Sequence, residues 1–376
     1  MKPPRCFYEG VATLTGCIIG AGILGIPYAI AKSGFWTGML IILVLGVVTI
    51  LIHLMTGEVV LRTKACHQLV GYADKYIGKL GKSLMTIAMI IGVYGAMVAY
   101  TIGVSESLTS IFGGYHGLWA VAFYVIMCVI LFGGLGVLKT SELFMETIKL
   151  LIFAVLVSVI FGSQHFDASN FTGFSWNLLL PYGIILFAYL GTAAVPELCE
   201  ELKPCRIWTK RAVIIGTLIP IIVYALFALA VIGVTGGDVT QVATIGLVEK
   251  MGGGIFLLLH VFAILAMATS FIALGYALKS MYNVDYRLTH SESWALTIVV
   301  PALLVFLGAD SFVKTLEITG ILSGGLTGIL IVLVHSRAVK KSERKPEYHL
   351  KSNKLLYAAI IALFSIGILY GIISIF

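Results

Sequence analysis

Charged residues are scarce in this sequence. Only 11% of its 376 residues are charged, whereas 59% are hydrophobic and the mean hydropathy is +1.03. Soluble globular chains carry about 25% charged residues, because their surfaces face water. This chain cannot cover a water-facing surface with so few charges, and we therefore expect an integral membrane protein.

Two further features are missing. The six cysteines show no C-x-x-C spacing, so we expect neither a zinc site nor a disulfide framework. The longest polar stretches are residues 62–80, 236–253 and 337–354, and none could hold a separate catalytic domain. The first two are typical of short amphipathic helices, and the third is a basic loop. The sequence therefore predicts no enzyme, no cofactor and no resident metal.

Long apolar runs are what the chain has in abundance. Runs of about 20 apolar residues cross a bilayer as helices, and they are far longer than the roughly ten alternating residues of a barrel strand. We expect one all-α membrane domain over residues 1–376, with eleven transmembrane helices. These helices are expected at residues 8–31, 35–61, 81–109, 118–138, 141–161, 176–201, 208–235, 254–283, 291–308, 311–336 and 355–376.

The lysines and arginines of the connecting segments set the orientation. With the N-terminus in the cytoplasm, 21 of the 25 basic residues lie in inside segments, and only Lys32, Lys250 and Lys314 lie outside. Such an asymmetry is the usual signature of membrane topology. We therefore expect a cell-membrane protein with a cytoplasmic N-terminus and an extracellular C-terminus. The net charge of +7 then faces anionic lipid, so nucleic acid is not expected as a partner.

The stretch GAGILGIP, residues 20–27, lies inside the first expected helix. Its glycines fit G-x-G-x-x-G, the dinucleotide-binding fingerprint, but no strand precedes them and the segment is apolar throughout. Gly20 follows Tyr8 by twelve residues, about 18 Å at helical rise, which places it near the middle of the bilayer. Three glycines and Pro27 weaken a helix there. We therefore expect an unwound segment, which a membrane tolerates only beside protein or a wet cavity.

A second interruption falls in the sixth expected helix, at FAYLGTAAVPE, residues 187–197. Gly191 again lies near mid-bilayer, and Pro196 follows it. The glycines could simply let helices pack closely, as in G-x-x-x-G pairs. Paired breaks in corresponding helices of two halves are, however, typical of inverted-repeat transporters. The expected repeats are residues 8–161 and 176–336, with residues 355–376 as an extra helix.

At these breaks the chain resembles the amino acid/auxin permease family, within the amino acid–polyamine–organocation group that shares the leucine-transporter fold. The resemblance implies a membrane symporter for amino acids, and the eleven expected spans fit it. It covers nearly the whole chain. It is carried by TGCIIGAGILGIPYA at 15–29, GAMVAYTIGVSESL at 95–108, FAYLGTAAVPELCEEL at 187–202 and AMATSFIALGYAL at 266–278.

A zwitterionic amino acid needs partners for both of its charges in a low-dielectric site. The N–H groups that begin the half-helix after the first break suit a carboxylate, and carbonyls freed at the second break suit an ammonium. Aromatic side chains near both breaks are expected to line the side-chain pocket, although ordinary helix packing could also explain them. The candidate substrate-binding residues are Gly20, Ala21, Gly22 and Ile23 for the carboxylate, Phe187, Ala188 and Gly191 for the ammonium, and Tyr100, Phe187 and Tyr189 for the side chain.

Two coupling ions fit the sequence. Relatives of this fold often hold sodium between the first and eighth helices, and the resemblance would place it among the Gly16 and Ile19 carbonyls and the hydroxyls of Thr269 and Ser270. Lys149 favours a proton instead. Its motif ELFMETIK resembles the fifth-helix segment of proton-coupled permeases, in which a lysine ammonium sits where sodium would otherwise bind.

Lys149 is the one basic residue that the topology assigns to neither side of the membrane. Charges inside the membrane are functional by default, but this lysine could also snorkel to the interface or pair with Glu146 three residues back. We predict a proton-coupled importer of neutral amino acids that works as a monomer by alternating access. The alternatives are sodium coupling, or another small amine-like solute on the same fold.

Overall fold

The computed structural model describes residues 2–133, 135–176, 178, 181–307 and 311–375, the side chains of 135–142, 374 and 375 excepted. Within these residues the chain forms helices joined by loops, and no strand. The α-helices are α1 Arg5–Ile18, α2 Gly22–Ser33, α3 Phe35–Arg62, α4 Leu69–Ile77, α5 Lys79–Phe112, α6 His116–Gly133, α7 Leu135–Phe161, α8 Tyr182–Ala188, α9 Val195–Glu201, α10 Thr209–Thr235, α11 Ala243–Met251, α12 Phe256–Ser280, α13 His290–Phe306, α14 Phe312–Thr319, α15 Gly325–Lys340 and α16 Lys354–Ile375. Short 3₁₀ helices are η1 Ala168–Asn170, η2 Thr192–Ala194, η3 Lys203–Trp208 and η4 Gly253–Ile255, and π segments are η5 Met281–Asp285 and η6 Gly320–Gly324.

The predicted membrane-spanning helices are confirmed. In the described part of the chain, nine helices are long and apolar enough to cross a membrane, and a tenth span results when α1 and α2 are counted as one bent helix. The remaining predicted span corresponds to α13, which is apolar but has only 17 residues. The short amphipathic helices expected in the polar segments are α4 and α11.

One predicted boundary is wrong. The fourth and fifth spans were expected to meet near residues 139 and 140, but α6 ends at Gly133 and α7 begins at Leu135. Glycine weakens a helix by about 1 kcal/mol relative to alanine, whereas Lys139 is a good helix former. For this reason α6 ends at Gly133, and α7 includes Lys139 and its polar neighbours, which were expected to separate the two spans.

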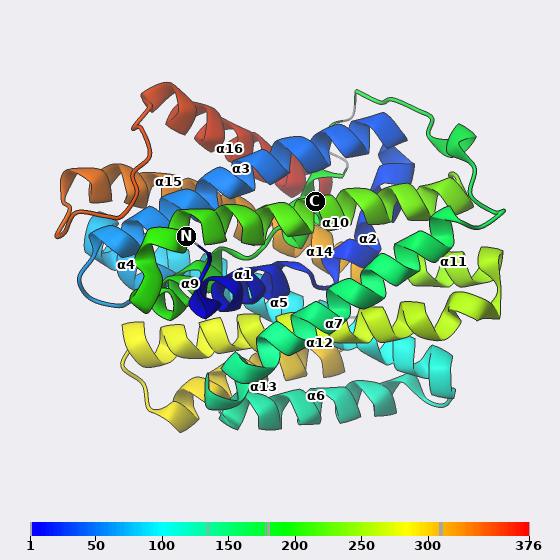
Figure 1. Ribbon diagram of the computed structural model, residues 1–376. Coiled ribbons are helices and arrows are strands. Elements are labelled where there is room, and N and C mark those ends of the chain that lie inside the picture. Colours follow the sequence, from blue (N-terminus) through cyan, green and yellow to red (C-terminus); the bar gives the residue numbers. More distant parts are fainter. Residues whose placement is uncertain (1, 134, 177, 179–180, 308–310, 376) are drawn as a thin grey trace.

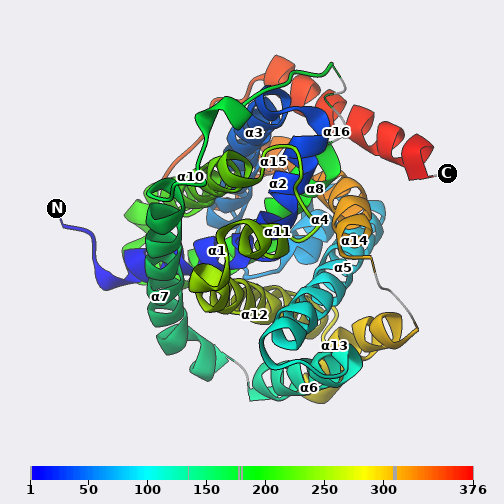
Figure 2. The same cartoon turned by 90° about the vertical axis from the view of Figure 1, so that its right-hand side faces the viewer.

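The two interrupted helices form the centre of the bundle. Viewed from one end, α1, α2 and α8 lie inside a ring made by α3, α10, α7, α12, α5 and α14, while α6, α13 and α16 lie further out (Figure 2). Burial agrees with this picture, since 89% of an apolar 18-residue stretch of Tyr182–Glu201 is buried, but only 22% of the corresponding stretch of Lys354–Ile373. The outer helices thus expose their apolar residues to lipid, and the broken ones are enclosed by protein.

The structure corrects the expectation for the cysteines. Cys6, near the start of α1, forms a disulfide with Cys205 in η3, 199 residues further along the chain. The pairing follows from packing, because α1 lies against α9 and η3. Two cysteines so far apart leave no spacing signal in the sequence.

Candidate functional site

The first break separates α1 from α2 at residues 19–21, and the two helices differ in direction by 52°. Gly20 donates its N–H to the Ile18 carbonyl over 2.9 Å. The N–H groups of Ala21 and Gly22 donate no backbone hydrogen bond to any described residue, whereas that of Ile23 bonds the Gly20 carbonyl at 3.4 Å. Two of the four amides predicted to receive a carboxylate therefore have no backbone partner among the described residues.

Pro27 does not contribute to this break. It lies inside α2, which continues to Ser33. Proline removes a single helical hydrogen bond, here one near the start of the helix. The unwinding therefore rests on the residues from Ile19 to Ala21 alone.

The second break lies between α8 and η2, at residues 189–191, and α9 follows with Pro196 in its first turn. Two of the three carbonyls expected to be free have local partners. The Phe187 carbonyl accepts from the Leu190 N–H at 2.9 Å, and that of Gly191 accepts from the Ala194 N–H at 3.0 Å. The Ala188 carbonyl instead accepts from the Tyr224 hydroxyl of α10.

The two breaks lie against each other. A Cβ atom added to Gly22 would be 2.5 Å from both the Cα and the Cβ of Ala188, and one added to Gly191 would overlap Ile18. The Tyr224 hydroxyl, from α10, lies 2.6 Å from the Ile18 carbonyl and 2.8 Å from that of Ala188. A single hydroxyl proton is thus shared between a carbonyl of each break, and Tyr224 has no exposed surface.

Tyr224→Phe is expected to destabilise the protein by about 1–3 kcal/mol, because two buried carbonyls lose their shared donor while the ring stays in place. Thermal unfolding of the purified protein in detergent measures this. Tyr182→Phe is the matched control, since the Tyr182 hydroxyl is buried without a hydrogen-bond partner among the described residues. Its loss should be neutral or stabilising. Equal effects of both substitutions would contradict a role for Tyr224 in joining the breaks.

Lys149 reaches the first break from α7. Its Nζ donates to Glu146 Oε1 at 2.6 Å, to the Thr269 hydroxyl at 3.1 Å and to the Ile19 carbonyl at 3.3 Å. The side chain is 0% exposed, so it does not snorkel to an interface. The structure thus brings the lysine ammonium to the oxygens that the sequence suggested for a cation.

Ser270 completes this cluster from α12. Its hydroxyl lies 2.8 Å from the Gly16 carbonyl and 3.1 Å from the Ile19 carbonyl. A Cβ on Gly16 would fall 2.5 Å from Glu146 Oε1, so glycine is what lets the carboxylate approach α1. All five predicted coupling residues, Gly16, Ile19, Lys149, Thr269 and Ser270, therefore lie in one buried cluster with Glu146.

The three predicted aromatic residues have different neighbours. Tyr100 turns its hydroxyl to the first break, where a Cβ on Gly20 would lie 2.8 Å from it. Phe187 packs against Gly320 in η6. Tyr189 donates its hydroxyl to the Ile42 carbonyl of α3 at 3.0 Å and packs on Tyr224. All three residues are buried, and the contacts given above are with different parts of the bundle.

An apolar pocket with about 370 Å³ of empty space, part of it open to solvent, lies beside the second break. We call it the break-six pocket. Of the predicted site residues it includes only Gly191, and its polar groups are three hydroxyls. Its lining consists of Leu69, Met89, Gly92, Val93, Leu190, Gly191, Thr192, Ala193, Leu274, Ser323 and Thr327. Four of these residues belong to the second break and its 3₁₀ turn, three come from α5, and two come from η6 and the start of α15. The residues of α5 and η6 carried no signal in the sequence except a glycine and a serine.

Comparison with known proteins gives a family for nearly the whole chain. The model of the tryptophan/tyrosine permease family matches residues 4–373. A glutamine transporter 2 of Aliivibrio fischeri is 25% identical over 378 residues, which cover 96% of each chain. The tyrosine-specific transport system 1 of Haemophilus influenzae is 24% identical over 332 residues, 82% of each chain. These relatives are named as transporters and not as enzymes.

Solved structures share the fold. Mhp1, a nucleobase-cation-symport-1 family transporter solved in a closed conformation with bromovinylhydantoin bound, superposes with a TM-score of 0.69 at 15% identity and covers 98% of this chain and 90% of its own. MhsT in complex with L-phenylalanine gives a TM-score of 0.68 at 16% identity, with 99% of each chain covered. The predicted all-α transporter fold with interrupted helices is therefore confirmed.

Proposed function

This chain belongs to the tryptophan/tyrosine permease family, and from that membership we propose that it imports neutral amino acids by proton symport. It is a multi-pass membrane transporter, and its relatives include proteins named as transporters of glutamine and of tyrosine. The observation that carries the coupling proposal is the position of Lys149, whose ammonium donates to the Ile19 carbonyl at the first break.

A neutral substrate is supported by the lining of the central region. The break-six pocket holds apolar side chains and hydroxyls but no charged residue. A charged substrate side chain would be costly there without a countercharge. The relatives named for glutamine and tyrosine transport point to the same class.

The α-carboxylate is proposed to bind the N–H groups of Ala21 and Gly22. These amides lie at the start of α2, where the helix dipole favours an anion. Neither donates to the backbone of a described residue. The α-ammonium is proposed to lie near the Ala188 carbonyl, in competition with the Tyr224 hydroxyl.

Proton coupling is supported by the hydrogen bonds that the oxygens of the predicted cation site already accept. The ammonium of Lys149 and the hydroxyl of Ser270 both donate to the Ile19 carbonyl, at 3.3 Å and 3.1 Å. Sodium in the same place would lie close to a positive ammonium, and like charges repel strongly in a low-dielectric interior. Loss of a proton from Lys149 in each cycle would loosen the bonds between α7 and the first break.

The proposed cycle follows from the fold. The repeats at residues 8–161 and 176–336 would form two interlocked halves, and the first, second, sixth and seventh spans would rock against the third, fourth, eighth and ninth. Kinship with the amino acid/auxin permease family, a monomeric state, and a cell-membrane location with a cytoplasmic N-terminus are parts of the same proposal.

Reconstitution into proteoliposomes tests the function. We expect labelled L-tyrosine or L-glutamine to accumulate when the lumen is alkaline relative to the outside, and sodium to be unnecessary. A protonophore should abolish accumulation, because it removes the driving gradient without touching the protein. Accumulation that follows a sodium gradient at equal pH would replace the proton by sodium. Absence of amino acid uptake under every gradient would reject the proposed function.

A further inference from the structure

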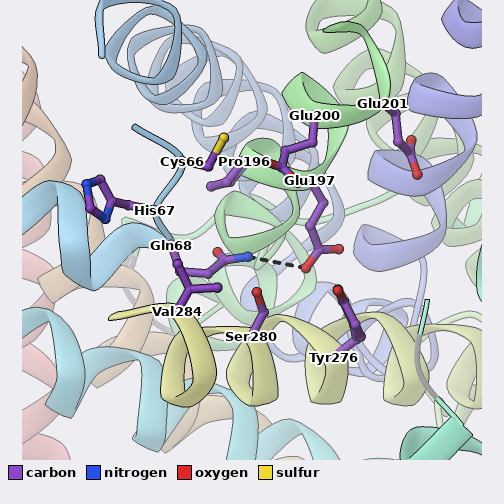
Figure 3. Close-up of a pocket in the computed structure, with 10 residues that line it drawn as sticks. All are labelled: Cys66, His67, Gln68, Pro196, Glu197, Glu200, Glu201, Tyr276, Ser280 and Val284. Carbon is purple, nitrogen blue, oxygen red and sulfur yellow. Dashed lines mark hydrogen bonds between the residues drawn. The ribbon is translucent and has the colours of Figure 1, made fainter. Parts of the chain in front are cut away.

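A second pocket lies at the end of the bundle that carries α4 and α9 (Figures 1 and 3). It contains about 450 Å³ of empty space, part of it open to solvent, and we call it the vestibule pocket. It is lined by Cys66, His67, Gln68, Pro196, Glu197, Glu200, Glu201, Tyr276, Ser280 and Val284. These residues come from three segments: the loop before α4, α9, and α12 with η5. Neighbouring residues of the same three segments line the break-six pocket, namely Leu69, Ala193 and Leu274. The vestibule pocket therefore lies next to the centre on the way out of the bundle.

Gln68 carries an unused acceptor in this pocket. Its residue surface is 3% exposed, and its Nε2 donates to Glu197 Oε1 at 3.3 Å (Figure 3). Its Oε1 is buried and accepts from no described group. Leaving a buried acceptor unsatisfied costs about 1–3 kcal/mol, so a donor that enters the pocket would recover this free energy.

The backbone beside Gln68 is held in place by a carboxylate. Asp285 accepts from the Gln68 N–H at 3.2 Å and from the Gly71 N–H at 2.8 Å. Asp285 ends the π segment that follows α12, so Gln68 is attached to that helix. The Gln68–Glu197 hydrogen bond then joins α12 and its neighbours to α9.

The charges of the lining are acidic. Three glutamates line the vestibule pocket, and its described lining residues include no lysine or arginine. Glu201 turns away to accept from the Thr13 hydroxyl of α1 at 2.9 Å, and Glu200 pairs with Lys203 at 3.2 Å. Glu197 is the carboxylate that faces the other polar groups. Figure 3 shows the hydroxyls of Tyr276 and Ser280, one helical turn apart on α12, pointing toward it.

We propose that the vestibule pocket is a transit site for the ammonium group of the transported amino acid. An ammonium has three donors and no acceptor, and the pocket offers it the Glu197 carboxylate, the Gln68 Oε1 and a hydroxyl of Tyr276 or Ser280. The inference rests on the proposed function, since it concerns the same substrate on its way between the centre and one face of the membrane.

The test is a one-sided change in affinity. In Glu197→Gln, the concentration of L-tyrosine or L-glutamine that half-saturates transport from the vestibule face should rise about tenfold, the effect of losing one charge-assisted hydrogen bond. The half-saturating concentration measured from the opposite face should stay unchanged. The new amide keeps an oxygen for Gln68 Nε2, so the fold is preserved. Gln68→Met, which loses the acceptor at similar length, should act in the same direction.

Two controls define the site. Glu9→Gln changes a carboxylate of α1 that lies outside the pocket lining and pairs with Arg5 at 2.7 Å, and it should leave the half-saturating concentration at both faces unchanged. The exposed Cys66 thiol at the pocket, labelled by an impermeant maleimide, reports which face of each vesicle is outside. Methylammonium chloride added at the vestibule face should inhibit wild-type transport but not that of Glu197→Gln, and equal sodium chloride should inhibit neither.

The outcomes separate the two proposals. Suppose that wild-type vesicles transport the amino acid, but that Glu197→Gln changes the half-saturating concentration at neither face or equally at both. The transit site is then rejected and the proposed function stands. If sodium chloride inhibits as methylammonium does, the pocket binds cations in general and the ammonium assignment is rejected. If the wild-type protein carries no amino acid at all, the proposed function itself falls.

Discussion

Lys149→Gln should abolish amino acid uptake driven by a pH gradient. The ammonium of Lys149 donates to the Glu146 carboxylate, the Thr269 hydroxyl and the Ile19 carbonyl, and glutamine cannot gain or lose a proton in its place. Exchange of amino acid across the membrane without a gradient should persist, because the amides of Ala21 and Gly22 remain. Accumulation in proteoliposomes at inside-alkaline pH, compared with equilibrium exchange, measures the difference.

A second variant separates coupling from folding. Removing one partner of a buried ion pair leaves an uncompensated charge and costs about 3–5 kcal/mol. In Lys149→Gln this charge is that of Glu146, which is 3% exposed. Glu146→Gln combined with Lys149→Gln removes both charges, so it should fold more stably than the single variant. It should still fail to accumulate substrate.

Lys279 supplies the matched control. It is also a buried lysine, 5% exposed, but its Nζ donates to the Leu131 carbonyl at 2.7 Å, near the end of α6 and outside the central cluster. Lys279→Gln should lower thermal stability and leave proton-driven uptake in place. Sodium-dependent uptake that survives in Lys149→Gln would show that the lysine is not the coupling group.

The positions of the two breaks along the chain could be predicted from the sequence because both depend on local composition. Glycine is costly in a helix, and counting residues from the span ends placed Gly20 and Gly191 near mid-bilayer. The same counting placed Lys149 inside the membrane, where a charge is expensive enough to require partners. The structure provides those partners from α1 and α12, at the residues expected from the motifs.

The missed features depend on contacts between distant parts of the chain. Tyr224 lies in an apolar run that any lipid-facing helix could carry, yet its hydroxyl joins residues 206 and 36 positions away. The hydrogen bonds of the Phe187 and Gly191 carbonyls could not be predicted for another reason. A broken helix can refold locally into turns, and the amides of Leu190 and Ala194 take up both carbonyls. Sequence gives the place of a break but not the turn that fills it.

Gly22→Ala should abolish substrate binding and transport. A Cβ at residue 22 would lie 2.5 Å from the Cα and Cβ of Ala188 and 3.1 Å from its backbone N. Backbone atoms cannot move aside as the end of a flexible side chain can, so the two breaks must separate. Overpacking of this kind costs about 1–3 kcal/mol, and it displaces the Gly22 amide proposed to receive the carboxylate. Binding of labelled amino acid to the purified protein measures the loss directly.

Gly237→Ala is the control for this substitution. Gly237 lies outside the helices and has no atom within 4 Å of the position of an added Cβ, so alanine there should bind and transport as the wild-type protein does. Gly20→Ala gives an intermediate case, because its neighbours are the side-chain oxygens of Tyr100 and Ser270 at 2.8 Å. We expect it to weaken binding less than Gly22→Ala, since side chains can shift. Wild-type binding in Gly22→Ala would mean that the breaks are further apart in the working protein, and that the carboxylate binds elsewhere.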